Sequence, residues 1–522
     1  MLIFQLQLKL RLIDFILMKF NIKKYIPFLK RGKSTTMSLQ SIKGHEEYRL
    51  PLPITNISYM FFPLNELTNP ANINLISEEL NIDSKVVNED INQLITGMRT
   101  DLTCCLEYPY VEEYYRDSYY SFYSRKHHNY NRNCFRLSFF YSSVNEGNYY
   151  EIDLADKFYG YTVFRPTPKR IIGYTFLSPS IYERNNFSIC YCKRTVSIMG
   201  RILEVTGFPF SGQDGEMNSC AENAIVIMFD YFSRRYNKYS RVLPSQIASH
   251  LSDYVLNRKQ PSTGLDMDTI SNIIENMGMT TRRYIKQDNN VTIAQGISSE
   301  TFADMLHIYI ESGIPIYVST STHAFLIIGR ENKYFDNGAR VVCMNDNDQP
   351  YSLLESIENI DDFIVPVPEN ILLDAEHLNF RECIKSISQE FPDIESLKYD
   401  ERFHHRVYLT TSRSYKAYIA NSNFSTENKT VITSIAMPRF VWVCEFAQNL
   451  TDDIKSTIID LTMVLDATDY PIGYNHLLLL KTKEKMIVPD SDKTIFQRKV
   501  YSIFDSHESM SPFMNNLKGG SI

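Results

Sequence analysis

Two common motifs are missing from this chain, and so is an excess of positive charge. The 522 residues contain no Cys-x-x-Cys pair, so the spacing typical of zinc ligands is absent. They contain no Gly-x-x-x-x-Gly-Lys-Ser/Thr motif either, which excludes a P-loop nucleotide site. The net charge of −7 argues against a general nucleic-acid-binding protein. The length predicts roughly two to four domains, and we expect no metal and no other cofactor.

Uninterrupted apolar runs are missing from the N-terminal 36 residues, where Lys9, Arg11 and Asp14 break the hydrophobic stretch. The segment is therefore too interrupted to span a bilayer. Eight Lys or Arg among Leu, Ile and Phe in residues 1–34 predict a basic amphipathic extension that contacts an anionic membrane surface weakly. The alternative, which we favour, is that translation begins at Met18 or Met37, so that residues 1–36 are not translated.

Residues 37–198 are rich in tyrosine and form the first of three predicted domains. Amphipathic spacing over Leu75–Met98 predicts helix, and Gly160–Pro179 reads as two short strands joined by a Pro-rich turn. Eleven tyrosines lie within Tyr108–Tyr150, interleaved with arginines. This pattern suits stacking on single-stranded nucleic acid, but acidic residues dilute the charge, and tyrosines at helical spacing usually pack a core. We therefore expect an α+β domain and no nucleic-acid partner.

Residues 369–522 are predicted to form a C-terminal α+β domain, and they carry no catalytic signature. Helical patterns cover Glu376–Gln389 and Thr451–Ile459. Strand-like runs lie at Tyr415–Ile419, Phe440–Phe446 and His476–Leu480. The segment Lys518–Ile522 is expected to be a frayed end.

Residues 199–368, the middle domain, hold a cysteine in a setting typical of a nucleophile. A polar, Gly-containing loop ends at Cys220, and the pattern over Ala221–Tyr236 is apolar nearly all round, which predicts a buried helix. A thiol at the first turn faces unpaired backbone N–H groups and the positive end of the helix dipole, and both favour the thiolate. The alternative is a small buried cysteine that only packs.

Three further residues have the types and the order that a cysteine nucleophile requires. Gln213, on the preceding loop, could direct its amide N–H toward the oxyanion of a tetrahedral intermediate. His323 opens a short apolar run that looks like a buried strand ended by Gly329, and it could serve as general base. Asp346 follows a second strand-like run and could orient the imidazole. Asn345 is an alternative for that role.

The stretch from about Gly207 to Tyr351 resembles a papain-like cysteine peptidase domain, and its layout is most similar to the peptidases that cut double-glycine leader peptides and their stand-alone relatives. Thr263–Gly278 resembles the family's second helix. Phe302–Ser312 reads as a further helix, and Gly313–Ser319 resembles the strand that enters the histidine hairpin. The resemblance implies a helix that carries the nucleophile, packed on an antiparallel sheet. It implies these roles: nucleophile Cys220, base His323, orienting acid Asp346 and oxyanion-hole amide Gln213.

The sequence departs from the family pattern beside the nucleophile. Papain has a second cysteine before its nucleophile and an aromatic residue after it, whereas Ser219 and Ala221 stand here. Leader peptidases commonly have a glycine after the nucleophile, which Ala221 replaces. Glu222 in the first turn opposes a nearby thiolate.

We expect a thiol-dependent peptidase that acts on a peptide or isopeptide bond of a peptide or protein through an acyl-enzyme. One alternative is an inactive or acyl-transferring relative of the same fold that serves as a binding module. Another is a scaffold whose cysteine is incidental. The nine scattered cysteines indicate a reducing compartment, so we expect the cytoplasm.

Overall fold

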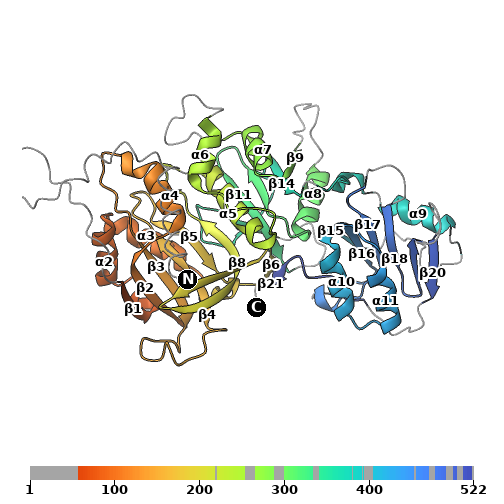
Figure 1. Cartoon of the computed structure of the whole chain (residues 1–522), viewed down its shortest axis with the longest axis horizontal. Helices are drawn as coiled ribbons and strands as arrows, with labels where there is room; N and C mark the ends of the chain where they lie inside the picture. The colour runs from red at the N-terminus through yellow and green to blue at the C-terminus, as the bar shows by residue number, and fades with distance from the viewer. Residues whose placement is uncertain are drawn as a thin grey trace, which may run out of the picture. The chain divides into compact units, whose positions relative to one another are not determined.

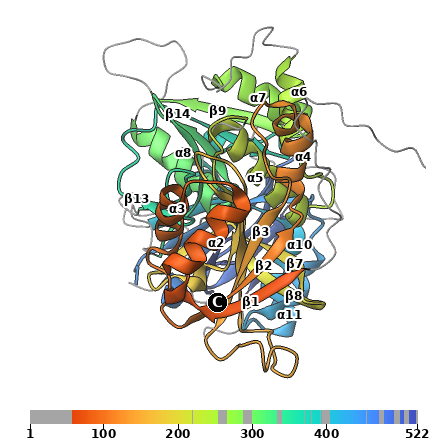
Figure 2. The ribbon, with the colours of Figure 1, turned by 90° about the vertical axis from the view of Figure 1, so that its left-hand side faces the viewer.

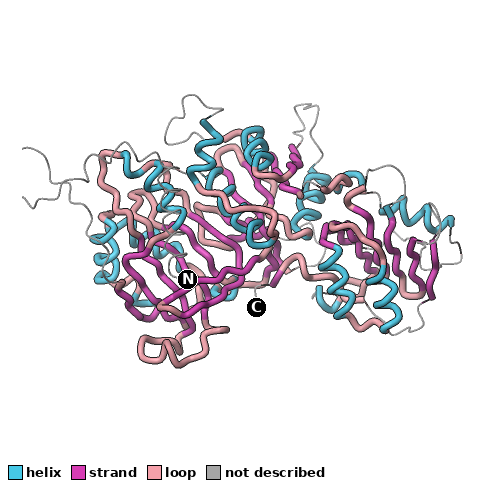
Figure 3. The backbone as a smooth tube through the Cα atoms, viewed as in Figure 1, coloured by secondary structure: helices cyan, strands magenta, loops and turns pink. Residues whose placement is uncertain are grey.

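The structure is a computed structural model in which helices and antiparallel sheets alternate along the chain (Figures 1 and 3). The α+β class is therefore confirmed. The described residues are 57–217, 220–252, 265–286, 299–332, 340–368, 370–378, 380–390, 392, 404–451, 454–469, 476–489, 498–502 and 510–519. The predictions for residues 1–36, including the membrane-surface contact and the alternative start sites, lie outside these ranges.

Seven antiparallel strands form the first sheet. They are β1 (Ser58–Pro63), β2 (Leu102–Tyr110), β3 (Cys134–Tyr141), β4 (Phe158–Phe164), β5 (Ile172–Leu177), β7 (Cys192–Ile198) and β8 (Arg201–Ser211). Their order across the sheet is β1-β2-β3-β4-β5-β8-β7. β4 and β5 are the two strands expected around the Pro-rich turn, and they pair as expected. The boundary predicted between residues 198 and 199 falls inside the β7–β8 hairpin, so the first sheet continues to Ser211.

Three helices accompany the first sheet: α2 (Pro70–Leu80), α3 (Ser84–Ile95) and α4 (Glu113–Ser121). Figure 2 shows α2 and α3 in front of strands β1 to β3. The tyrosine-rich stretch supplies much of the core here, because its aromatic rings are removed from water. The buried members are Tyr114, Tyr115, Tyr123, Tyr130 and Tyr149. For these residues the expectation that the tyrosines pack a core is confirmed.

The middle sheet combines strands from three distant parts of the chain. Its main strands are β9 (Thr280–Ile285), β10 (Ile316–Ser319), β11 (Ala324–Glu331), β12 (Val341–Met344), β13 (Ser352–Leu354) and β14 (Asp362–Val367). They run in the order β13-β12-β11-β10-β14-β9. β6 (Phe187–Ile189) adds to β11, and β21 (Lys518–Gly519) adds to β6. The expectation of a frayed end is therefore wrong for Lys518 and Gly519.

β11 does not end at Gly329 as expected but continues to Glu331. The backbone carbonyl of Ser188 in β6 approaches Gly329 so closely that a Cβ would collide with it. The glycine therefore marks the contact with β6 rather than a strand end. Helices α6 (Pro244–Ser252), α7 (Met267–Asn276) and α8 (Ser299–Glu311) complete this part. α7 and α8 confirm the two helices expected here.

The third sheet is an antiparallel meander. Its strands are β15 (His404–Thr411), β16 (Phe440–Ala447), β17 (Leu461–Asp466), β18 (Leu477–Lys481), β19 (Lys485–Pro489) and β20 (Arg498–Ser502). α10 (Ser412–Asn421) and α11 (Thr426–Ser434) pack on one face, and α9 (Phe380–Glu390) packs its buried residues with the other (Figure 1). The strand expected at Tyr415–Ile419 is wrong, because those residues belong to α10. Tyr415 and Ile419 are four residues apart and both fully buried, which places them on one helix face.

Helix α5 (Cys220–Arg235) lies where the first and middle sheets meet. It packs against β7 and β8 on one side and against β11 on another. Every residue from Ala221 to Phe232 is buried. An amphipathic stripe would leave half of the helix exposed, whereas contact with two sheets explains an apolar pattern that runs nearly all round. The buried helix expected after Cys220 is confirmed.

A buried chain of charges joins the middle and third sheets. Glu311, at the end of α8, pairs with Arg330 of β11 and with Arg406 of β15, and Arg406 also pairs with Glu445 of β16. Burial alone would raise the pKa of Glu311, but the two arginines outweigh it and lower the pKa to about 2. The Glu311 carboxylate therefore stays charged between two cations at neutral pH.

We predict that Glu311→Gln destabilises the protein by about 3–5 kcal/mol, because two buried guanidinium groups lose their shared counter-ion. Stability should also decline in acid. A carboxyl whose pKa falls from 4.5 to about 2 on folding stabilises fully above the unfolded value and loses that contribution as pH falls through about 2. Urea unfolding at several pH values measures both effects.

The matched control is Glu355→Gln. Glu355 pairs with Arg340, but its side chain is 77% exposed, so the change should leave stability nearly unaltered. An equal loss in both variants would contradict the role given to the buried pair.

Candidate active site

The loop before Cys220 is a tight turn that leads from β8 into α5. The Asp214 carboxylate accepts the backbone N–H groups of Glu216 at 2.9 Å and Met217 at 2.8 Å, which is the turn an Asp favours. Tyr130 of the first sheet's domain donates its hydroxyl to Glu216 at 3.0 Å. Cys220 then begins the helix and is half-buried.

Two cations from the β4–β5 turn hold the same loop. Arg165 is buried and donates to the backbone carbonyl of Gly212 at 2.5 Å. Lys169 donates to the carbonyl of Gly215 at 3.0 Å. The backbone that positions the cysteine is therefore fixed by the first sheet as well as by α5.

His323 comes to the site from the turn between β10 and β11. The turn is closed by the Thr320 backbone N–H, which donates to the His323 carbonyl at 2.9 Å, and by the Thr320 hydroxyl, which accepts the His323 N–H at 3.2 Å. β11 pairs antiparallel with β12, with Leu326 opposite Met344. The residues after Met344 therefore lie beside His323, as the two strand-like runs predicted.

Asn345 makes the hydrogen bond that orients the imidazole. His323 Nε2 lies 2.7 Å from Asn345 Oδ1. The amide of Asn345 cannot be reversed without loss, because its Nδ2 donates to Asp348 at 2.7 Å and its Oδ1 accepts the Asn347 backbone N–H at 3.1 Å. Nε2 therefore carries a proton and donates it to Asn345. The amide of Asn347, 3.4 Å from Nε2, is then a weak contact, since it would need that nitrogen as an acceptor.

Asp346 lies next to the imidazole but does not make that hydrogen bond. Its Oδ1 is 3.4 Å from His323 Nε2 and has no hydrogen-bond partner among the described residues. Its Oδ2 faces the Asn223 amide of α5 at 3.5 Å. Burial raises the pKa of Asp346, opposed by the charges of His323 and Arg170 and by the Asn223 contact. Of the two alternatives that the sequence left open, Asn345 thus occupies the orienting position and Asp346 supplies a neighbouring charge.

The second ring nitrogen of His323 faces Cys220. With Nε2 bound to Asn345, Nδ1 is the nitrogen available for the hydrogen bond between His323 and Cys220. Burial lowers the pKa of His323, but the hydrogen bonds with Cys220 and Asn345, the Asp346 charge and the Cys220 charge together raise it to about 9. At neutral pH the ring is therefore an imidazolium beside the sulfur.

Gln213 is connected to the site through Asn347, in the loop after β12. Its Nε2 donates to Asn347 Oδ1 at 3.0 Å. One N–H is used in that bond, and a primary amide has a second. The structure thus brings all four residues expected from the sequence close together. Gln213, in the loop before Cys220, is hydrogen-bonded to the loop that carries Asn345.

The first sheet's domain also supports the loop after β12. Gln93 of α3 donates its amide to the backbone carbonyl of Asn347, and its Oε1 accepts from Arg170 at 3.0 Å. Burial lowers the pKa of Arg170, opposed by the charges of Asp90, Asp346 and Asp348, so this cation faces the acidic loop. Sequence reasoning did not identify Gln93 or Arg170. They lie far from the cysteine in the chain, and no motif or period marks them.

Cys220 differs from the other described cysteines in exposure. It alone among eight is not buried. Desolvation raises the pKa of six other thiols, to about 12 for Cys105 and Cys190 and further for Cys104, Cys134, Cys192 and Cys343. A reagent in water therefore meets one accessible thiol in this part of the chain.

No protein-family model matches the chain, and no curated protein matches it either. The described residues contain no group of three His, Cys, Asp or Glu side chains that could hold a metal ion. None of their helices combines the length and the apolar content needed to cross a membrane.

We predict that Cys220 distinguishes the charge of alkylating reagents. Iodoacetate should react faster relative to iodoacetamide while His323 is an imidazolium, because the cation attracts the reagent's carboxylate. Since the pKa of His323 is raised to about 9, this advantage should disappear as pH rises through about 9. Mass spectrometry of Cys220 peptides gives both rates. In His323→Gln the ratio should be low and independent of pH, and a pH-dependent ratio there would contradict the assignment.

We predict that Gln93→Leu loosens the loop around Asn347, because two hydrogen bonds of about 1 kcal/mol each are lost. Amide hydrogen exchange in residues 345–348 should speed up, and the pKa seen in the Cys220 alkylation ratio should shift toward an ordinary histidine value.

Asn92→Leu is the matched control on the same helix, because the hydrogen bonds of the Asn92 side chain to described residues go to Asn88, within α3. A Gln93 variant with unchanged exchange in the loop would show that this contact is not needed.

Proposed function

We propose that the chain is a thiol-dependent peptidase that uses a papain-like arrangement of cysteine, histidine and asparagine. What supports the proposal is the unbroken set of contacts from Cys220 through His323 to Asn345, at the start of a buried helix. In this arrangement Cys220 is the nucleophile, His323 the acid and base, and Asn345 the positioning residue. Asp346 stabilises the imidazolium by its charge.

The reaction we propose begins with attack by the Cys220 thiolate on the carbonyl carbon of a peptide or isopeptide bond. The carbonyl electron pair moves to oxygen and gives a tetrahedral oxyanion. When the carbonyl re-forms, the amine leaves with the proton of His323, and a thioester remains. Neutral His323 then takes a proton from water, whose oxygen attacks the thioester. The carboxylic acid product leaves, and the thiolate and imidazolium are restored.

The oxyanion needs donors that are in place before the reaction. The backbone N–H of Cys220 has no partner within its own helix, because it is the first residue of α5. We assign the second donor to the Gln213 amide, whose other N–H is anchored on Asn347. An anchored amide loses little freedom when charge develops on the substrate oxygen.

The hypothesis of a papain-like peptidase also concerns the fold. A nucleophile at the start of a buried helix, a histidine at the start of an antiparallel strand and an orienting amide after the next strand agree with the layout of that family. We propose a peptide or protein as substrate, in a reducing compartment such as the cytoplasm that keeps the accessible Cys220 thiol free.

We predict that Gln213→Ala reacts with iodoacetamide at Cys220 as fast as the original protein but loses about two to three orders of magnitude in turnover of a cleavable peptide. The reason is that an oxyanion donor acts on the transition state and not on the thiolate. A peptide library read by mass spectrometry supplies the substrate.

Cys220→Ala should abolish cleavage of the same peptide. Cys343→Ala is its matched control, because it makes the same small change in β12 of the adjoining sheet and should keep turnover. Cleavage that persists in Cys220→Ala would eliminate the proposed mechanism.

A further inference from the structure

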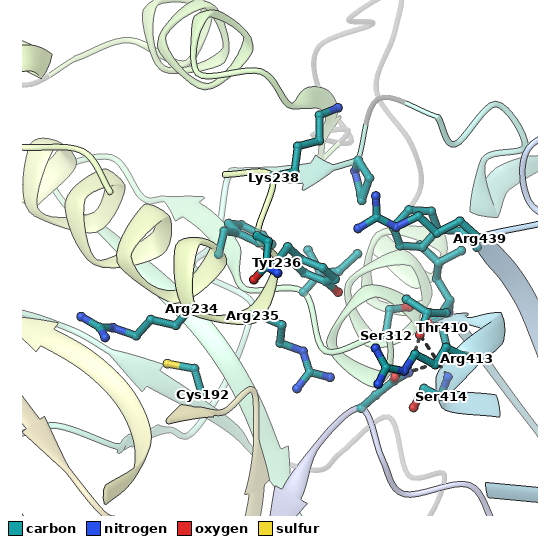
Figure 4. A pocket seen from close by; sticks show the side chains of 18 of the residues that line it. Cys192, Arg234, Arg235, Tyr236, Lys238, Ser312, Thr410, Arg413, Ser414 and Arg439 are labelled. Carbon is teal, nitrogen blue, oxygen red and sulfur yellow. Dashed lines mark hydrogen bonds between the residues drawn. The ribbon is translucent and has the colours of Figure 1, made fainter. Parts of the chain in front are cut away.

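A cavity lies at the far end of α5, away from Cys220. Its volume is about 850 Å³, within the range of small-molecule sites. The last turn of α5, the start of β7, the end of β15 and the first turn of α10 line it (Figure 4). Because α5 has 16 residues, its two ends are about 24 Å apart. The cavity is therefore separate from the cysteine site.

The cavity is lined by cations and by hydroxyl groups. Six of its residues are basic: Lys193, Arg234, Arg235, Lys238, Arg413 and Arg439. Among the described residues that line it, none is acidic. The chain as a whole carries a net charge of −7. A cluster of six basic residues in one cavity is therefore not explained by the overall composition.

Three of these arginines have no carboxylate partner among the described residues. Arg235 donates to the Tyr191 carbonyl at 3.4 Å and lies over the Tyr191 ring, and Arg439 lies over its neighbouring Phe440 ring. Arg413 forms no ion pair with any residue that the structure describes. Arg234, by contrast, is bound to the buried Asp230 at 2.9 Å.

Figure 4 shows the directions of these side chains. Arg413 and Arg439 extend from the third sheet's side toward the end of α5, Arg235 extends toward them, and Arg234 points away. Unpaired guanidinium groups that converge on one concave space repel one another. An anion between them would remove that repulsion.

We propose that this cavity binds a small ligand with two or more linked phosphate groups. A guanidinium fork donates two parallel hydrogen bonds to a phosphate, and three such forks match several phosphate oxygens. The hydroxyl of Ser412 stands beside them in the lining. The backbone amides at the start of α10 contribute less to binding. The N–H of Ser412 already donates to the Arg439 carbonyl, and the N–H of Ser414 donates to the Thr411 hydroxyl. The arginine side chains are thus the recognising groups.

Two sources supply this chemistry, a nucleoside polyphosphate and an inorganic polyphosphate. The aromatic ring of Tyr236, the residue after α5, lines the cavity and offers a surface on which a base could stack. Titration calorimetry of the full chain with adenosine triphosphate and, separately, with inorganic triphosphate distinguishes them. Both titrations omit divalent cations, because the lining includes no described carboxylate that would bind one.

We expect binding that weakens as salt is raised, since the contacts are ionic. The double variant Arg413→Ala, Arg439→Ala should bind about tenfold more weakly or worse, because charge-assisted hydrogen bonds are lost. Both side chains are exposed, so the variant should keep its fold, and an unchanged unfolding transition verifies this. Arg125→Ala is the control, since Arg125 is exposed, forms no ion pair within the described ranges and lies outside the cavity.

Equal affinity for the two ligands would show that the protein recognises the phosphates alone. Tighter binding of adenosine triphosphate would show that the base also stacks on the aromatic surface. The proposal is overturned if neither ligand binds. It is equally overturned if the double variant binds as tightly as the Arg125→Ala control.

Discussion

The burial of α5 on all sides is the constraint on which the rest of the structure depends. A helix whose residues from Ala221 to Phe232 are all buried cannot be covered by a single sheet, so it requires both the first and the middle sheet. Its first residue is the half-buried Cys220, which places the thiol where the two sheets meet. The groups that position the site therefore come from both sides. His323 comes from the middle sheet. Arg165, directly after β4 of the first sheet, binds the Gly212 carbonyl in the loop before Cys220.

The tyrosine-rich region around the first sheet thus supports the loops at Cys220. Gln93 and Arg170 support the loop after β12, while Lys169 and Tyr130 hold the loop before Cys220. Those two loops carry the orienting amide and the proposed oxyanion donor. Small displacements of either would misplace groups that must act within hydrogen-bond distance. The buried ion pairs of Glu311 connect the third sheet to the middle sheet in a similar way. Ser312, the next residue, lines the basic cavity.

The sequence predicted which candidate residues lie close together better than it predicted the elements around them. Cys220 and His323 were found because a nucleophile needs a helix start and a base needs a nearby strand end, and both requirements leave local patterns. The choice between Asp346 and Asn345 depends on the direction of one amide, which its contact with Asp348 decides and which no sequence pattern encodes. The Tyr415 helix was mistaken for a strand because short runs of aromatic and aliphatic residues suit both. Contacts such as that of Gln93 join residues that only the fold brings together.

The central claim is that His323 is protonated at neutral pH and forms a hydrogen bond with Cys220, an arrangement that we propose stabilises the Cys220 thiolate. The ultraviolet absorbance of the thiolate tests it most directly, as the difference between the original protein and Cys220→Ala at neutral pH. The account predicts a difference band equal to one thiolate, which disappears in His323→Ala. The account is contradicted if the band is absent at neutral pH and rises only where an ordinary exposed thiol ionises.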